Sequence, residues 1–413
     1  MRSRSSRRNF LLRASQLGLV SSLAACTSST ASLAISGAAS SQIAFSGEFL
    51  SPNHSLNVKP PLKLLHANLP IPEPPLEVKI GQMLLVGFRG QVLNENSRVL
   101  SEIRDLHLGG VVLFGNNVSS PAQVQTLTAT LQKAATIPLL VSIDQEGGQV
   151  MRLDRRFGIT TNYSAQALGT MNDLVKTNAE AELFAQTLAD LGINLNLAPV
   201  VDLNLNPSNP VIGALGRSFS ADPAVVTNQA TTFIQAHHKH NIYCTLKHFP
   251  GHGSSRNDTH LGFVDVTDTW QDSELQPYTE LVKNDTCDAI MTAHIFNGKL
   301  DAKLPATLSH AIVTGILRER LGYGGLIISD DMQMRAISKY YDFATAIQLA
   351  IEAGIDMLAI ANNVAYQETA AARATKIIHG LVDSGKLSEA RINQSYQRIM
   401  RLKGRLPTPA QTT

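Results

Sequence analysis

The chain has 413 residues, enough for one large domain or two ordinary ones. Its apolar content of 44% and charged content of 16% are typical of a globular protein. The formal net charge is +2, but residues 1–25 contribute five arginines and no acid, so the rest of the chain carries −3. This balance argues against a nucleic-acid-binding protein.

The N-terminal segment has the features of an export signal. The stretch SRRNFLL at 6–12 resembles a twin-arginine signal, and the apolar run at 17–25 is too short to span a membrane as a mature helix. LAAC at 23–26 resembles a lipobox, in which the cysteine is acylated and becomes the first mature residue. We expect an exported protein, anchored by a lipid on Cys26 to a membrane of the cell envelope. The alternative is an irregular tail with a chance Arg-Arg pair.

The segment from 26 to 75 is rich in Ser, Ala, Thr and Pro and lacks sustained periodicity, so we interpret it as a flexible tether. Strand and helix patterns alternate over 76–405, which we assign to one catalytic domain, and 406–413 form a tail. Cys244 and Cys287 each lie in or beside an apolar run, which favours free buried thiols over a disulfide.

Eight short apolar runs alternate with amphipathic segments. Helix-start chemistry occurs at Ser120-Pro121, at Asp222-Pro223 and at Ser309. This alternation predicts a (β/α)8 TIM barrel. An open doubly wound sheet is the alternative, although no glycine-rich nucleotide loop follows the first run. The runs are Lys79–Phe88, Gly110–Phe114, Pro138–Ile143, Ile193–Val201, Ile242–Leu246, Ala289–Thr292, Gly325–Ile328 and Asp356–Ile360.

Polar side chains follow five of these runs. A barrel carries its catalytic residues at the C-terminal ends of its strands, so this recurrence predicts an active site there. The clusters are Asp144 to Gly148 after the third run, Asp202 after the fourth, Lys247 and His248 after the fifth, His294 after the sixth, and Ser329 to Asp331 after the seventh.

The stretch KHFPGHGSSRNDTH at 247–260 is the densest of these clusters. It holds a lysine, three histidines and an aspartate, which are costly to bury without partners. Pro250, Gly251 and Gly253 interrupt regular structure, so the later residues belong to a loop. A purely structural role explains this composition poorly.

Adjacent carboxylates follow the seventh run. Neighbours on a strand point in opposite directions, so only one of Asp330 and Asp331 can face the pocket. That aspartate could be a nucleophile towards a sugar, a base or a metal ligand. We expect the other to make structural hydrogen bonds.

The same region carries a family resemblance. ILRER at 316–320 followed by GLIISD at 325–330 resembles the signature of glycoside hydrolase family 3. The resemblance covers about residues 75 to 405 and implies that Asp330 is the nucleophile. Gln333 departs from the pattern, which has a small residue there.

KHFPGHG followed by Asp-Thr-His resembles the single-domain bacterial β-N-acetylhexosaminidases of that family. The resemblance implies that Asp258 and His260 form the acid/base dyad on a mobile loop. Histidine suits proton donation because its ordinary pKa is near neutrality, and an aspartate two residues away can fix its tautomer. Glycines beside the loop allow it to close over substrate.

Further motifs resemble substrate-binding elements of the family, namely DQEGGQVMR at 144–152, GRSF at 216–219 and the Lys-His pair. They imply that Asp144, Arg152, Arg217, Lys247 and His248 bind sugar. We treat Asp202 and His294 as supporting residues, Glu146 as structural and His252 as a residue that shapes the turn.

Together these features predict a retaining exo-β-N-acetylglucosaminidase that acts on peptidoglycan fragments or chitooligosaccharides through a covalent glycosyl-aspartate. We expect a carbohydrate substrate, no metal or organic cofactor, no nucleic-acid partner and a monomer. Many family members with β-glucosidase activity carry a second α/β domain, which we do not expect here, and by resemblance this expectation and the Asp-Thr-His loop together favour the N-acetylglucosaminidase branch. The alternatives are a phosphorylase, a β-glucosidase and an inactive glycan-binding lipoprotein.

Overall fold

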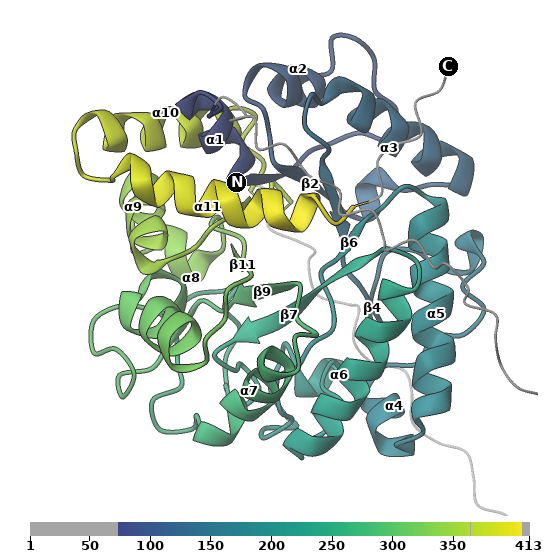
Figure 1. Cartoon of the computed structure of the whole chain (residues 1–413). Coiled ribbons are helices and arrows are strands. Elements are labelled where there is room, and N and C mark those ends of the chain that lie inside the picture. Colours follow the sequence, from purple (N-terminus) through teal and green to yellow (C-terminus); the bar gives the residue numbers. More distant parts are fainter. Residues whose placement is uncertain (1–72, 364, 407–413) are drawn as a thin grey trace, which may run out of the picture. The chain divides into compact units, whose positions relative to one another are not determined.

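The computed structural model describes residues 73–363 and 365–406. A sheet of eight parallel strands forms its centre, in the order β11-β9-β7-β6-β3-β2-β1-β12 (Figure 1). The strands are β1 (Leu84–Gly87), β2 (Gly110–Leu113), β3 (Leu140–Ile143), β6 (Leu195–Asn196), β7 (Tyr243–Phe249), β9 (Ala289–Thr292), β11 (Leu326–Ser329) and β12 (Leu358–Ile360).

The two edges of this sheet meet and close it into a barrel. A parallel bridge joins Ile328 of β11 to Met357, directly before β12. The N–H of Ser329 donates to the carbonyl oxygen of Met357 over 2.9 Å. The predicted (β/α)8 barrel is therefore confirmed, since a doubly wound sheet would keep two open edges.

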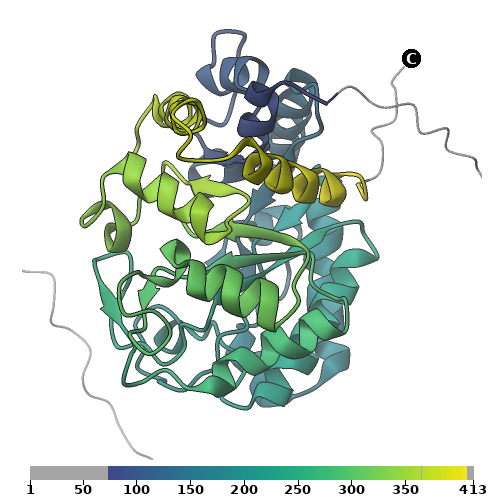
Figure 2. The same ribbon diagram turned by 60° about the vertical axis from the view of Figure 1, so that its left-hand side comes forward.

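Helices surround the barrel, and the first, α1, lies beside the last, α11, in both views (Figures 1 and 2). The helices are α1 (Leu76–Gln82), α2 (Arg98–Asp105), α3 (Pro121–Ala134), α4 (Ala165–Met171), α5 (Leu174–Asp190), α6 (Pro223–His238), α7 (Gln276–Lys283), the π-helix η6 (Ala311–Arg320), α8 (Arg335–Ser338), α9 (Phe343–Ala353), α10 (Ala370–Asp383) and α11 (Glu389–Lys403). Short 3-10 turns are η1 (Gly115–Asn117), η2 (Arg155–Phe157), η3 (Gly213–Leu215), η4 (Asp272–Leu275) and η5 (Ala306–Leu308).

Helix-start residues act as the sequence predicts. The Ser120 hydroxyl accepts from the Gln123 N–H, and Pro121 opens α3. The Asp222 carboxylate accepts from the Ala224 N–H at the start of α6. The Ser309 hydroxyl accepts from the N–H of Ile312 over 3.1 Å at the start of η6. Each cap satisfies a backbone donor that the helix itself leaves unpaired.

Two predicted strands are shorter than expected. The run Lys79–Phe88 spans most of α1 as well as β1, which are separated only by Met83. The last four residues of α1, Lys79–Gln82, are buried like all of β1, so the boundary coincides with no change in burial. In the run Ile193–Val201, only β6 has the ladder of a strand, and cis-Pro199 follows it.

The remaining strands form two small ladders on the loops, β4 (Gln145–Gly147) with β5 (Val150–Met151), and β8 (Val264–Asp265) with β10 (Ile295–Phe296). The barrel strands β1, β2, β3, β7, β9 and β11 are buried along their whole length. Helices cover their outer side and side chains fill the inside, so polar groups reach solvent mainly at the two rims.

The predicted export signal, Cys26 and nearly all of the predicted tether lie outside the described residues, as does most of the tail. Among the residues that the structure describes, no helix is long and apolar enough to cross a membrane.

Candidate active site

Strand β7 extends through Phe249, so Lys247 and His248 lie within it rather than on the loop beyond. The N–H of Lys247 donates to the carbonyl oxygen of Pro199, and the N–H of Val201 donates to the carbonyl oxygen of Lys247. The predicted run, Ile242–Leu246, was therefore three residues short at its C-terminal end. This backbone hydrogen bonding to residues 199–201 fixes where the side chains of Lys247 and His248 start.

A cluster of charged side chains lies where β3 and β7 approach the C-terminal rim. Its members are Asp144, Glu146, Arg152, Arg217 and Lys247. Lys247 Nζ lies 2.8 Å from Asp144 Oδ1 and 2.7 Å from Glu146 Oε1. Arg217 forms a bidentate pair with Glu146, with both N···O distances 2.8 Å. Arg152 NH2 lies 3.1 Å from Asp144 Oδ2. The structure thus brings four predicted sugar-binding residues together around Glu146.

Attraction within this cluster outweighs the cost of burial. Burial alone would raise the pKa of Asp144, but Lys247 and Arg152 lower it overall. Burial would also raise the pKa of Glu146, but Arg217 and Lys247 outweigh this effect and lower the pKa to about 2. The pKa of Lys247 is raised, because the two carboxylates overcome the effect of its own burial. All of these groups are therefore charged at neutral pH.

His248 is oriented by Asp202. The Asp202 carboxylate lies 2.7 Å from His248 Nδ1, and it also accepts from the backbone N–H groups of His248 and His252. A carboxylate can only accept, so Nδ1 carries the hydrogen and Nε2 faces away from Asp202. Nε2 lies 3.5 Å from Arg217 NH2, which links His248 to the charged cluster. Asp202 therefore has the supporting position expected for it.

The two adjacent aspartates after β11 have different surroundings. Asp331 Oδ1 accepts from the N–H groups of Gln333 and Ala361, the structural role expected for one of the pair. Asp330 Oδ1 accepts only from the N–H of Asp331, over 2.7 Å. Its Oδ2 has no hydrogen-bond partner among the described residues. Asp330 is thus the better placed of the two to react with a ligand.

Histidines surround the Asp330 carboxylate. Burial alone would raise its pKa, but His294, His248 and His260 lower it overall. Burial raises the pKa of Asp331 to about 6, without comparable compensation. Asp330 is therefore the more strongly ionised carboxylate, as a nucleophile requires.

His294 is held from both ring nitrogens. Nδ1 lies 2.9 Å from the Thr307 hydroxyl, and Nε2 lies 2.9 Å from the carbonyl oxygen of Asp331. Burial lowers the pKa of His294, so the ring is neutral at pH 7. A neutral ring can donate from only one nitrogen, and the carbonyl must accept, so Nε2 carries the hydrogen. Thr307, on η5, was missed from the sequence because nothing near it marks a site.

The predicted dyad forms on the loop after β7. His260 Nδ1 lies 2.8 Å from Asp258 Oδ1, which also accepts from the His260 backbone N–H over 2.7 Å. The His260 side chain is 56% exposed, in contrast to the 3% of Lys247. Since Asp258 only accepts, Nδ1 donates to it and Nε2 is left for proton exchange with a ligand.

The base of this loop is a tight buried turn. His252 Nδ1 lies 2.8 Å from the Ser255 hydroxyl, and Nε2 lies 3.3 Å from the Thr259 hydroxyl. Burial lowers the pKa of His252 to about 4, so it is neutral and shapes the turn as expected. Glu274 Oε2 accepts from the Gly253 N–H over 3.0 Å, a contact the sequence did not suggest.

Beyond the dyad, the loop packs on the rim through aromatic rings. Phe263 lies 5.3 Å from Phe296 and 5.8 Å from Tyr340, measured between ring centroids. The N–H of Ala336 in α8 donates to the carbonyl oxygen of Thr259 over 3.2 Å. These contacts join the dyad loop to the segments that follow β9 and β11.

Gln333, the departure from the family pattern, has a local role. Its side-chain amide donates to Asn362 Oδ1 and to the Ala365 carbonyl oxygen, and its oxygen accepts from the Asn362 N–H. Gln333 therefore ties the segment after β11 to the segment after β12, without disturbing Asp330.

Within residues 73–363 and 365–406, no group of three His, Cys, Asp or Glu side chains is arranged to hold a metal ion.

Comparison with known proteins identifies the family. Residues 75–402 match the model of the glycosyl hydrolase family 3 N-terminal domain. The chain is 35% identical to a beta-hexosaminidase A of Pseudoalteromonas piscicida over 73% of this chain and 54% of that one. It is 36% identical to a beta-hexosaminidase of Tolumonas auensis over 68% of this chain and 83% of that one.

A solved structure is also similar, that of a glycoside hydrolase family 3 beta-N-acetylglucosaminidase from Paenibacillus sp. str. FPU-7. It has a TM-score of 0.75 and 36% sequence identity, and the match covers 80% of this chain and 62% of that one. The chain thus spans less than two thirds of two of these three relatives. The matched segment contains the whole barrel and every residue of the site described above, and the chain belongs to glycosyl hydrolase family 3.

Proposed function

We propose that the protein is a retaining exo-β-N-acetylglucosaminidase. The observation that carries this proposal is the placement of Asp330, an ionised carboxylate at the C-terminal end of β11 with histidines around it. Enzymes that retain anomeric configuration need such a nucleophile together with a separate proton donor. The Asp258–His260 pair supplies the donor.

In the first step, Oδ2 of Asp330 attacks the anomeric carbon and the bond to the leaving oxygen breaks. Oδ1 is held by the Asp331 N–H, so Oδ2 is the oxygen free to attack. The proton on Nε2 of His260 passes to the leaving oxygen. The resulting imidazole is stabilised in position by Asp258.

In the second step, Nε2 of His260 takes a proton from water and the oxygen attacks the anomeric carbon. The bond to Asp330 breaks, and the carboxylate and the protonated histidine are restored. Both steps therefore balance with water as the only co-substrate. The charged cluster around Lys247 would hold sugar hydroxyls, since carboxylates accept and Lys and Arg donate.

The substrate class follows from the relatives. The similar proteins named above are beta-hexosaminidases and a beta-N-acetylglucosaminidase, which supports a terminal N-acetylglucosamine as the sugar that is released. Peptidoglycan fragments and chitooligosaccharides both present such a residue. Comparing an aryl N-acetylglucosaminide with the matching aryl glucoside would separate this activity from that of a β-glucosidase.

The nucleophile can be tested with a matched pair of variants. We expect Asp330→Asn to lower kcat on an aryl N-acetylglucosaminide by about 10⁴-fold or more, because the amide cannot form the covalent intermediate. Asp331→Asn retains an oxygen that can accept the same two N–H bonds, and should keep activity within about tenfold. Comparable losses in both variants, or near-normal turnover by Asp330→Asn, would contradict the assignment.

Product analysis would establish the second step. Hydrolysis yields free N-acetylglucosamine whether or not phosphate is present. A phosphorylase would yield the sugar 1-phosphate and would turn over faster with phosphate. Trapping the intermediate with a 2-fluoro or 5-fluoro sugar, followed by mass spectrometry of peptides, should find the label on Asp330.

We also propose that the protein is exported and anchored through a lipid on Cys26, on the support of residues 6–26 alone. In its host, the wild-type protein should sediment with membranes and take up labelled palmitate. Cys26→Ser should remove both properties. Unchanged sedimentation of this variant would argue against the anchor.

A further inference from the structure

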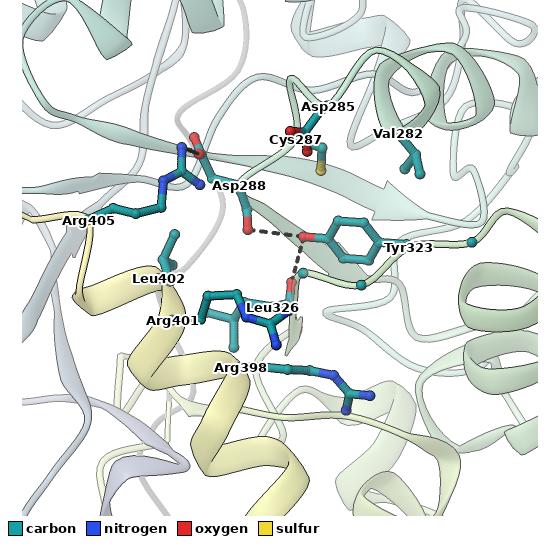
Figure 3. Close-up of a pocket in the computed structure, with 13 residues that line it drawn as sticks. Val282, Asp285, Cys287, Asp288, Tyr323, Leu326, Arg398, Arg401, Leu402 and Arg405 are labelled. Atoms are coloured by element: carbon teal, nitrogen blue, oxygen red, sulfur yellow. Dashed lines mark hydrogen bonds and ion pairs between the residues drawn. The ribbon is translucent and has the colours of Figure 1, made fainter. Parts of the chain in front are cut away.

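A cavity lined by charged residues lies at the opposite end of the barrel from Asp330. Its volume is about 260 Å³, and the segments leading into β9 and β11 form one side while α11 forms the other (Figure 3). Asp330 and His294 follow the far ends of these two strands. The lining residues used below are Asp285, Asp288, Gly324, Arg398, Arg401 and Arg405.

Three arginines reach this cavity from the end of α11. Arg398 and Arg401 are three residues apart on α11, which places them on one face of the helix, and Arg405 follows directly after the helix ends. Figure 3 shows them along the same side of the cavity. Cations near a helix C-terminus interact favourably with the helix dipole, by about 0.3–1 kcal/mol each. That effect alone does not explain why they converge on one concave surface.

The Asp288 carboxylate, which lines the cavity beside these arginines, already has several partners. Asp288 is buried, and its Oδ2 lies 2.6 Å from His238 Nε2 and accepts from the Cys244 N–H. Its Oδ1 lies 3.2 Å from Arg405 NH2. The Asp288 carboxylate therefore already serves a histidine, a backbone amide and one arginine.

A second buried acid is more heavily shared. Asp356 is fully buried and pairs with Arg318, with Arg391 at 3.7 Å and with Arg398 at 3.0 Å. Arg401 has no carboxylate within ion-pair distance among the described residues. Around the cavity there are thus five guanidinium groups and three carboxylates. The guanidinium groups are those of Arg318, Arg391, Arg398, Arg401 and Arg405, and the carboxylates are those of Asp285, Asp288 and Asp356. The cavity and the wall behind it therefore carry surplus positive charge.

The opposite wall offers backbone donors. The Tyr323 hydroxyl donates towards the carbonyl oxygens of Asp288 and Leu326, at 3.0 and 3.1 Å, which anchors the glycine-rich loop at 322–325. Within the part of the chain that the structure describes, the N–H groups of Gly324 and Gly325 have no hydrogen-bond partner. No atom lies within 4 Å of where a Cβ on Gly324 would be. A ligand oxygen could therefore approach this loop closely.

We propose that this cavity binds the phosphate group of a small phosphorylated molecule. Arginine forks match the oxygens of a phosphate, and unpaired backbone N–H groups add further donors. The cavity is larger than one phosphate and smaller than most drug-sized sites, which suits a phosphate with a short organic group. A free phosphate ester and a phospholipid headgroup both have this chemistry.

The test is calorimetric titration of the full-length protein with three probes, namely inorganic phosphate, glycerol 3-phosphate and the water-soluble lipid dihexanoylphosphatidylglycerol. Arg401→Gln removes an exposed arginine that has no acidic partner, and should weaken binding about tenfold. Asp285→Asn removes negative charge from the cavity wall and should tighten binding about threefold. Asn tolerates the φ of 53° at this position.

The matched control is Arg104→Gln. Arg104 is also an exposed arginine in the last turn of a helix, on α2, and should leave all three affinities unchanged. Opposite responses to Arg401→Gln and Asp285→Asn would locate the bound phosphate in this cavity. An unfolding effect of either variant could not produce this pattern.

The probes separate the two sources of phosphate. If the short-chain lipid binds at least about tenfold more tightly than glycerol 3-phosphate, the ligand is a headgroup; otherwise it is a free phosphate ester. Lack of binding by all three probes would overturn the proposal. So would binding that neither variant changes, because the phosphate would then occupy another surface, including the catalytic face.

Discussion

The two halves of the candidate active site differ in how they are held. The half that would hold sugar is centred on β7 and the end of β3 and is largely buried, with 3% of the Lys247 side chain and 27% of the Arg152 side chain exposed. The half that would deliver the proton lies on the loop beyond Pro250, with 56% of the His260 side chain exposed.

The proposed roles of the two halves would account for this difference. Hydroxyl recognition depends on fixed distances, which buried, mutually neutralising charges on strands provide. Proton transfer needs a group that reaches the leaving oxygen only when substrate is bound, which a loop can provide by closing. Mutations in the first half should therefore affect folding and activity together, and mutations in the second half should affect activity alone.

Lys247→Met should have the largest effect. It leaves the carboxylates of Asp144 and Glu146 buried without the cation between them, which costs about 3–5 kcal/mol of unfolding free energy. Urea unfolding should show this loss, and activity should fall to background. Lys239→Met, at an exposed ion pair with Glu182, is the control and should change stability by less than about 1 kcal/mol. Equal stability of the two variants would contradict the view of a cluster held by charge.

His260→Ala should have the next largest effect, and only on activity. We expect kcat on chitobiose to fall by about 10²–10³-fold, because the leaving sugar then departs without a proton. The loss should be much smaller for a dinitrophenyl glycoside, whose leaving group needs little protonation. The unfolding midpoint should not move, since the ring is mostly exposed. His379→Ala on α10 is the matched control, and equal losses on both substrates would argue against a proton donor.

The barrel itself could be predicted because each buried strand is a short apolar run between helix-start signals. The boundary at Met83 could not, since the buried end of α1 is followed by the buried β1 with only Met83 between them. The extension of β7 to Phe249 could not be predicted either, because the end of this strand is largely polar rather than apolar. Its last residues include a lysine and a histidine, which reside in a strand only because Asp144 and Asp202 pair with them.

Within the site, position along the strands indicated which residues would gather at the rim. It did not indicate which of them would pair. Glu146 and Arg217 are 71 residues apart and form a bidentate ion pair, although only Arg217 was assigned to substrate binding. Their contact depends on how the loop after β6 returns across the barrel mouth, and no local pattern encodes that path.

The turn between the two halves provides the smallest effect, through pH. Glu274 is buried beside Gly251 and Gly253, and burial raises its pKa to about 7. Its pKa in the unfolded chain is about 4.3, so between these values the folded protein binds more protons than the unfolded one. The unfolding free energy should therefore fall as pH rises from about 4.5 to 8, by about 3 kcal/mol for this group.

Glu274→Gln replaces the carboxyl with a neutral group of the same shape that can still accept from the Gly253 N–H. At pH 4 the variant should match the wild type in urea unfolding, because Glu274 is then mostly protonated in the folded and the unfolded chain alike. At pH 8 it should be more stable, by an amount approaching about 3 kcal/mol, because it has no charge to bury. A variant that is less stable at pH 8 would mean that the turn depends on the ionised carboxylate. The turn would then belong with the charged cluster around Lys247 rather than with the loop that carries His260.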